Sequence, residues 1–134
     1  MINMLRKVFK FTIIFIFTFL ILASEAKAGG ASLFLSPPSG TYAINSAFSI
    51  KVNVNSGGEA INAAEGTLVY NPAELSVVSL SKSSSIFTLW TTEPTFSNST
   101  GNISFGGGMP SNFTGTNGTI FSITFKAKAA PLPK

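Results

Sequence analysis

The side chains that most often carry out acid–base, nucleophilic or metal chemistry are scarce in this chain of 134 residues. It contains no histidine and no cysteine, and its only acidic residues are glutamates: Glu25, Glu59, Glu65, Glu74 and Glu93. No two of them stand at the short spacing that would indicate a pair of catalytic carboxylates. The cysteines and histidines that bind transition metals, and the aspartate-rich loops that bind calcium, are also missing. The inventory therefore argues against an enzyme, and we expect neither a cofactor nor a metal centre.

The N-terminus has the order of features found in a secretory signal peptide. Three basic residues precede an apolar run at residues 11–22, and small residues follow it. A membrane anchor is the alternative interpretation, but a membrane-spanning helix needs about 20 apolar residues and this run has little more than half of that. Ala26-Lys27-Ala28 fits a cleavage pattern, and Ser24-Glu25-Ala26 is a second one. We expect a signal peptide at 1–28, one domain at 29–129, and a tail or the start of a linker at 130–134.

Most of the basic residues lie in this N-terminal segment, so the remainder of the chain is nearly neutral. Electrostatic capture of nucleic acid needs a clustered basic patch. Lys126 and Lys128 alone do not make such a patch, so we expect no nucleic-acid partner. We expect contact with a membrane only during export.

Two segments alternate apolar and polar residues with the period of a strand that has one buried face. They are residues 48–55 (FSIKVNVN) and 120–128 (IFSITFKAK). Strands with one polar face each indicate two stacked antiparallel sheets rather than a parallel sheet under helices.

Shorter apolar stretches punctuated by Gly, Pro, Ser and Asn lie before and between these two segments. They are residues 31–36, 66–70, 75–80, 86–90 and 102–105. This spacing predicts an all-β fold, a two-sheet antiparallel β-sandwich. The clusters TEPT (92–95) and GGGMP (106–110) are expected to be turns or loops, and the glycine run lacks the lysine of a phosphate-binding loop.

Residues 61–75 (INAAEGTLVYNPAEL), followed by SVVSLS, resemble the third and fourth strands of a cohesin domain. In that family an acid-bearing strand leads into Tyr-Asp-Pro, and a Leu then opens an apolar strand; here Tyr70-Asn71-Pro72 takes the place of Tyr-Asp-Pro. Residues 118–129 resemble a late strand of the family, and residues 36–54 fit its opening. The resemblance implies a jelly-roll β-sandwich and a non-catalytic module that binds a dockerin-type protein in polysaccharide-degrading assemblies.

The resemblance also suggests binding residues on the third strand. Cohesins present an Asn there and, two residues later, an acid; the aligned residues are Ala63 and Glu65, so the acid is kept and the amide is not. Because Glu65 alternates with Ala64 and Gly66, it can stand outward on a sheet face. We expect Ala63, Glu65 and Thr67 to belong to a partner-binding face. The alternative for Glu65 is a solvated charge that only keeps the strand soluble.

A carbohydrate-binding module of the same architecture is the alternative function, since a flat aromatic ring can stack on a sugar. Trp90, the single tryptophan, and Tyr42 would supply the stacking, although packing in the core is the other interpretation of Trp90. A coplanar exposed row of aromatic rings would favour sugar, and a flat polar face around Glu65 would favour protein.

The family pattern further implies roughly two strands after residue 128, yet the prolines of AAPLPK (129–134) cannot donate hydrogen bonds to a sheet. We therefore expect either a sandwich that lacks its last strands, with an open sheet edge that permits self-association, or a piece of a longer protein. Either version is expected to be secreted, extracellular or held at the cell surface after cleavage of the signal peptide.

Overall fold

Seven strands make up the regular structure of residues 30–128, the part of the chain that the computed structural model describes. They are β1 (Ser32–Ser36), β2 (Ala47–Asn55), β3 (Ile61–Val69), β4 (Leu75–Ser81), β5 (Leu89–Ser97), β6 (Asn102–Phe113) and β7 (Gly118–Ala127). The predicted signal peptide, its cleavage site, the C-terminal tail and any strand after residue 128 lie outside the described residues. Within residues 30–128 no helix is long and apolar enough to cross a membrane.

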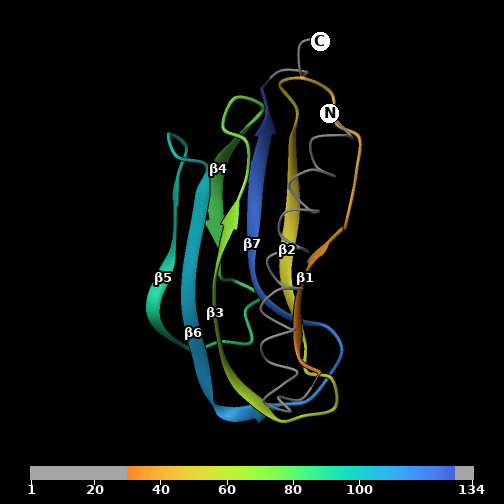
Figure 1. Ribbon diagram of the computed structural model, residues 1–134, viewed down its shortest axis with the longest axis vertical. Helices are drawn as coiled ribbons and strands as arrows, with labels where there is room; N and C mark the ends of the chain where they lie inside the picture. The colour runs from red at the N-terminus through yellow and green to blue at the C-terminus, as the bar shows by residue number, and fades with distance from the viewer. Residues whose placement is uncertain (1–29, 129–134) are drawn as a thin grey trace.

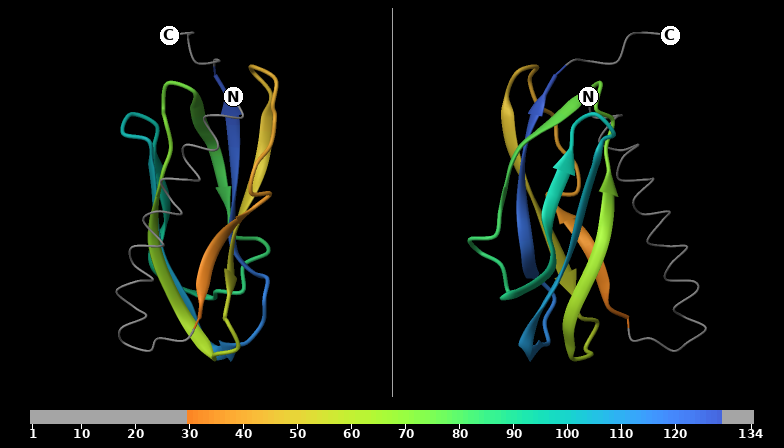
Figure 2. Two further views of the ribbon diagram at one scale, coloured as in Figure 1. Left: turned by 45° about the vertical axis from the view of Figure 1, so that its right-hand side comes forward. Right: turned by 90° about the vertical axis from the view of Figure 1, so that its left-hand side faces the viewer.

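The strands form two sheets that lie face to face (Figure 1). One has the order β1-β2-β7-β4 and the other β3-β6-β5, and every pair within them is antiparallel. The left view of Figure 2 shows the two layers from the side. The two segments with the clearest alternation are β2 and β7, which pair with each other inside the larger sheet. The predicted all-β, two-sheet sandwich is confirmed.

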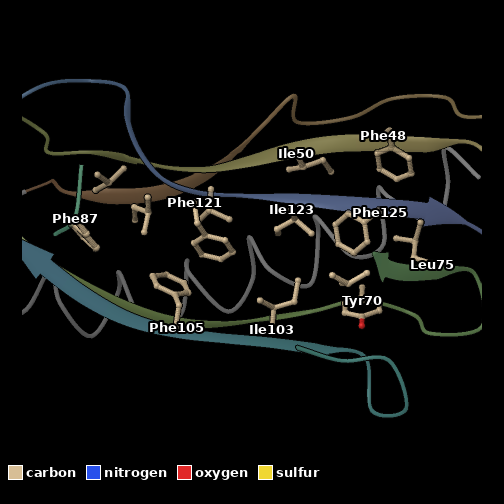
Figure 3. Packing of buried hydrophobic residues seen from close by; sticks show 14 of the residues in the cluster. Phe48, Ile50, Tyr70, Leu75, Phe87, Ile103, Phe105, Phe121, Ile123 and Phe125 are labelled. Carbon is tan, nitrogen blue, oxygen red and sulfur yellow. The ribbon is translucent and has the colours of Figure 1, made fainter. Parts of the chain in front are cut away.

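Aromatic and branched aliphatic side chains fill the space between the sheets (Figure 3). Alternate residues of the two central strands point inward, namely Phe48, Ile50, Val52 and Val54 of β2 and Phe121, Ile123, Phe125 and Ala127 of β7. The Phe121 ring lies against that of Phe105 on β6, with ring centroids 5.1 Å apart. Since removing a buried phenylalanine ring costs about 3–5 kcal/mol, this contact is a principal tie between the sheets.

The sheets are also joined at the side where β4 and β5 lie, through the side chain of Asn98. Its Oδ1 accepts hydrogen bonds from the Tyr70 hydroxyl (2.6 Å) and the Val77 N–H (2.8 Å), and its Nδ2 donates to the Val77 carbonyl (3.0 Å). Asn98 thus bonds to the backbone of β4 as a neighbouring strand would. Burial raises the pKa of the Tyr70 phenol, which keeps its hydroxyl protonated as a donor. An ion pair between Lys82, just after β4, and Glu93 of β5 also joins the two sheets on this side.

Two segments that the sequence suggested as turns are strands, because TEPT lies in β5 and GGGMP in β6. Pro94 sits on an edge strand within an irregular stretch of pairing, where proline is tolerated. Two of the three glycines of β6, Gly107 and Gly108, lie where a side chain would not fit. A Cβ on Gly107 would come within 2.8 Å of the Leu89 carbonyl oxygen, and one on Gly108 would meet the Asn62 carbonyl oxygen. The loop prediction was wrong because glycine serves close packing here rather than a turn.

We predict that Asn98→Ala lowers the free energy of unfolding by about 1–3 kcal/mol, since it leaves the Val77 N–H without its acceptor. Chemical denaturation of the variant and the parent measures the difference. Asn112→Ala, which removes an exposed amide from β6, is the matched control and should change little. Equal effects from the two substitutions would show that Asn98 does not join the sheets.

Candidate binding face

The three residues predicted to contact a partner stand on one exposed face. Ala63, Glu65 and Thr67 of β3 are exposed, whereas the intervening Ala64 and Gly66 are half-buried. A Cβ on Gly66 would lie 3.3 Å from the ring of Phe105, so the even-numbered positions point toward the core. The odd-numbered positions therefore form part of the outer surface of the three-stranded sheet.

Cross-strand pairing continues from these residues over the rest of that sheet. The rows are Ala63 with Gly108 and Leu89, Glu65 with Gly106 and Thr92, and Thr67 with Ser104 and Thr95. We call the surface made by these three rows the β3–β6–β5 face; its strands lie side by side in Figure 1.

The middle strand makes the centre of this face flat, because two of its three outward positions are glycines. A Cβ on Gly106 would lie 3.1 Å from Thr91 Oγ1 and 3.5 Å from Glu65 Cβ, so β6 adds no side chain there and the side chains of β3 and β5 flank its buried backbone. These outward glycines were not predicted, because a glycine run is typical of a loop. The available signal was the alternation that continues across the run, from Phe105 to Met109.

Charge on the β3–β6–β5 face is confined to Glu65. No residue of the described range 30–128 forms a hydrogen bond or ion pair with its carboxylate. Nearby, the hydroxyl oxygens of Thr67 and Ser104 lie 3.3 Å apart and share a hydrogen bond. An ionised carboxylate is an acceptor only, so Glu65 can bind a serine or threonine hydroxyl or a lysine ammonium brought by another molecule. The arrangement suits recognition.

The two aromatic residues considered for sugar stacking are half-buried and lie apart. Tyr42 stacks on Phe48, with ring centroids 3.6 Å apart and an interplanar angle of 5°. Trp90 packs edge-on against Phe87 at 5.8 Å, with Lys82 Nζ 5.2 Å from the centre of its ring. Figure 3 shows Phe48 and Phe87 at opposite ends of the core. Tyr42 and Trp90 therefore do not form one coplanar row.

Within residues 30–128 no three histidine, cysteine, aspartate or glutamate side chains are grouped so that they could hold a metal ion. Glu93, the acid nearest to the Trp90 region, is paired with Lys82, and Glu74 is buried beside the start of β4. Among residues 30–128, Glu65 is thus the acidic side chain in the three rows of the β3–β6–β5 face.

An antiparallel sandwich with one flat, sparsely charged sheet face has the build of a protein-binding module. The chain matches the family model of the cohesin domain over residues 34–131. Because this match covers most of its length, the chain belongs to the cohesin domain family. Cohesin domains are non-catalytic modules that bind other proteins, typically dockerins. Comparisons with curated proteins and with solved structures find no match.

We predict effects of different size for alanine at the two outward glycines, Gly106 and Gly108. Gly108→Ala should lower the free energy of unfolding by about 1–3 kcal/mol, because the new methyl group meets the backbone carbonyl of Asn62. Gly106→Ala should change it by less than about 1 kcal/mol, because the Thr91 side chain can rotate away and alanine reduces the entropy of the unfolded chain. Thermal unfolding compares them, and equal stability would contradict the crowding at Gly108.

Proposed function

We propose that the chain is a secreted or cell-surface adhesion module that docks a dockerin-type protein on the β3–β6–β5 face, within assemblies that act on polysaccharides. The observation that carries this proposal is the exposed Glu65 carboxylate in the middle row of the β3–β6–β5 face, which no residue of the range 30–128 pairs with. Membership of the cohesin family supports a protein as the partner.

The chemistry of the face limits what a partner must bring. Docking removes water from the Glu65 carboxylate, which costs free energy unless a donor takes the place of the water. A serine or threonine hydroxyl or a lysine ammonium supplies that donor. Because β6 adds no side chain at Gly106, the threonine side chains of β5 and the Glu65 side chain of β3 form the contact surface around the carboxylate. The exposed Leu89 in the neighbouring row offers an apolar contact.

We predict that Glu65→Ala weakens binding of a protein partner by at least about tenfold, since a charge-assisted hydrogen bond contributes on the order of 1.5–3 kcal/mol. Glu59→Ala removes the same charge from the turn between β2 and β3 and serves as the matched control. The measurement is titration calorimetry with a partner recovered from the source's secreted proteins. Unchanged affinity in Glu65→Ala would remove Glu65 from the interface.

A panel of insoluble polysaccharides, tested in the same way, separates the two functions. Retention of the protein on a polysaccharide, lost in Trp90→Ala and kept in Glu65→Ala, would replace the docking proposal by a carbohydrate-binding one. Protein capture that depends on Glu65, without retention on polysaccharide, supports docking.

Export is the part of the proposal that rests on the sequence of residues 1–28. We predict that the secreted protein begins at or near Gly29, because the residues before it fit a signal peptidase site. Intact mass spectrometry of protein from the culture medium measures this. An exported product that keeps residues 1–28 would contradict a cleaved signal.

A further inference from the structure

Four Asn-x-Ser/Thr motifs occur in the second half of the chain, and the proposed function uses none of them. They begin at Asn98, Asn102, Asn112 and Asn117. This motif is the acceptor for N-glycosylation in exported proteins. In a segment so rich in Asn, Ser and Thr such motifs also arise by chance, so the motif alone assigns nothing. The structure, however, places the four asparagines in different surroundings.

N-glycosylation uses two groups of the motif, the amide nitrogen of the asparagine and the hydroxyl two residues later. The transferase also has to bind the three residues in its own active site. A motif whose backbone is paired with strands on both sides is therefore not available to it. The hydrogen bonds and the strand pairing of each motif decide which of them meets these requirements.

The amide of Asn98 is already bonded within the domain. Its Nδ2 donates to the Val77 carbonyl at 3.0 Å, and its Oδ1 accepts from the Tyr70 hydroxyl and the Val77 N–H. A sugar on Nδ2 would disrupt the connection between β4 and the opposite sheet.

The motif at Asn102 lies inside the three-stranded sheet. Each of its three residues pairs with a residue of β3 and with one of β5. Its middle residue, Ile103, is fully buried. A transferase could bind this motif only after β6 had left the sheet.

The motif at Asn117 continues into β7. Asn117 Oδ1 accepts a hydrogen bond from Asn53 Nδ2 at 2.9 Å, and Gly118 and Thr119 pair with β2. The Thr119 carbonyl also accepts from the N–H of Ile86 at 2.8 Å. The residue that supplies the hydroxyl is thus held between two segments.

The motif Asn112-Phe113-Thr114 lies at the end of β6 and meets both requirements. Asn112 and Thr114 are exposed, and no residue of the range 30–128 forms a hydrogen bond with either side chain. The cross-strand register of β6 stops at Gly108 on both sides and resumes only at Phe113, opposite Ile61. The asparagine therefore stands in a stretch of β6 without paired neighbours.

This exposure does not come from the position of Asn112 at a sheet edge. Strand β6 is the middle strand of its sheet. A further strand beside β3 or β5 would be separated from β6 by that strand, so it would not lie next to Asn112.

We propose that Asn112 is an N-glycosylation site, the one of the four motifs that the folded chain offers to an oligosaccharyltransferase. The donor is an oligosaccharide on a polyprenyl diphosphate. The Asn112 amide nitrogen forms a bond to C1 of the first sugar and loses a proton, while the C1–O bond breaks and the diphosphate leaves with the electron pair. In the cell this step follows export, so there it rests on the proposed function.

A glycan on Asn112 would border the docking face. Asn112 lies outside the three rows that define the β3–β6–β5 face, four residues beyond Gly108 and hence at most about 14 Å from it along the strand. Modification at this site leaves the row of Glu65 free of attached sugar.

The test uses the purified folded chain, an oligosaccharyltransferase that accepts Asn-x-Ser/Thr, and its lipid-linked oligosaccharide. Intact mass spectrometry counts the oligosaccharides on each chain, and peptide mapping locates them. We expect one per chain, at Asn112. Asn112→Gln and Thr114→Ala should each abolish modification, whereas Thr114→Ser should retain it and Asn117→Gln should leave it unchanged. Thermal unfolding of each variant reports its fold.

The denatured chain, used as substrate in the same reaction, separates the effect of the fold from that of the sequence. Unfolding frees the other motifs, so we expect further oligosaccharides at Asn98, Asn102 and Asn117. A folded chain that stays unmodified at Asn112, or that is modified at another asparagine, overturns the proposal. So does a denatured chain that is modified at Asn112 alone, because the fold would then select nothing. Since the reaction involves neither a protein partner nor export, these outcomes are independent of docking and of the signal peptide.

Discussion

The packing of Phe121 against Phe105 is the contact on which the rest of the sandwich depends. Both rings are buried, and they belong to β7 and β6, the strands that lie inside their sheets with a neighbour on each side. Strands β3 and β5 pair with β6, and β4 pairs with β7, so the positions of residues on these edge strands depend on the two central ones. Glu65 lies where it does because β3 pairs with β6, and β6 is held by its phenylalanine.

The two sides of the sandwich differ in the interactions that join one sheet to the other. On one side Asn98 and the pair of Lys82 with Glu93 connect β4 to the opposite sheet. On the other side, among residues 30–128, no hydrogen bond joins β1 to β3, and Leu33 and Leu68 remain half-buried there. Within residues 30–128, β3 thus carries the charge of the outer face and lies at the edge of its sheet.

The sequence predicted those parts of the fold in which side chains alone decide the structure. Strict alternation identified β2 and β7, and alternation around Glu65 placed that side chain outward. It failed at β6, where glycine is a turn former by propensity but is required by the nearness of the Leu89 and Asn62 carbonyls. Alternation also could not predict whether the Trp90 side chain faces the core or the outer surface. Its orientation depends on the irregular pairing of β5 and on contact with Phe87. These features arise from contacts between strands distant in sequence, and no local pattern reports them.

The three successive glycines of β6 also have a consequence for the unfolded chain. A glycine in the middle of a strand destabilises the folded state by roughly 0.5–1 kcal/mol relative to alanine, because its backbone loses the most freedom on folding. The outer surface is flat at β6 because glycines there carry no side chains. The same glycines increase the backbone conformational entropy that β6 loses on folding. The central strand of the candidate interface, β6, therefore has a low intrinsic strand propensity at its glycines. Packing of its aromatic and aliphatic side chains in the core keeps it ordered.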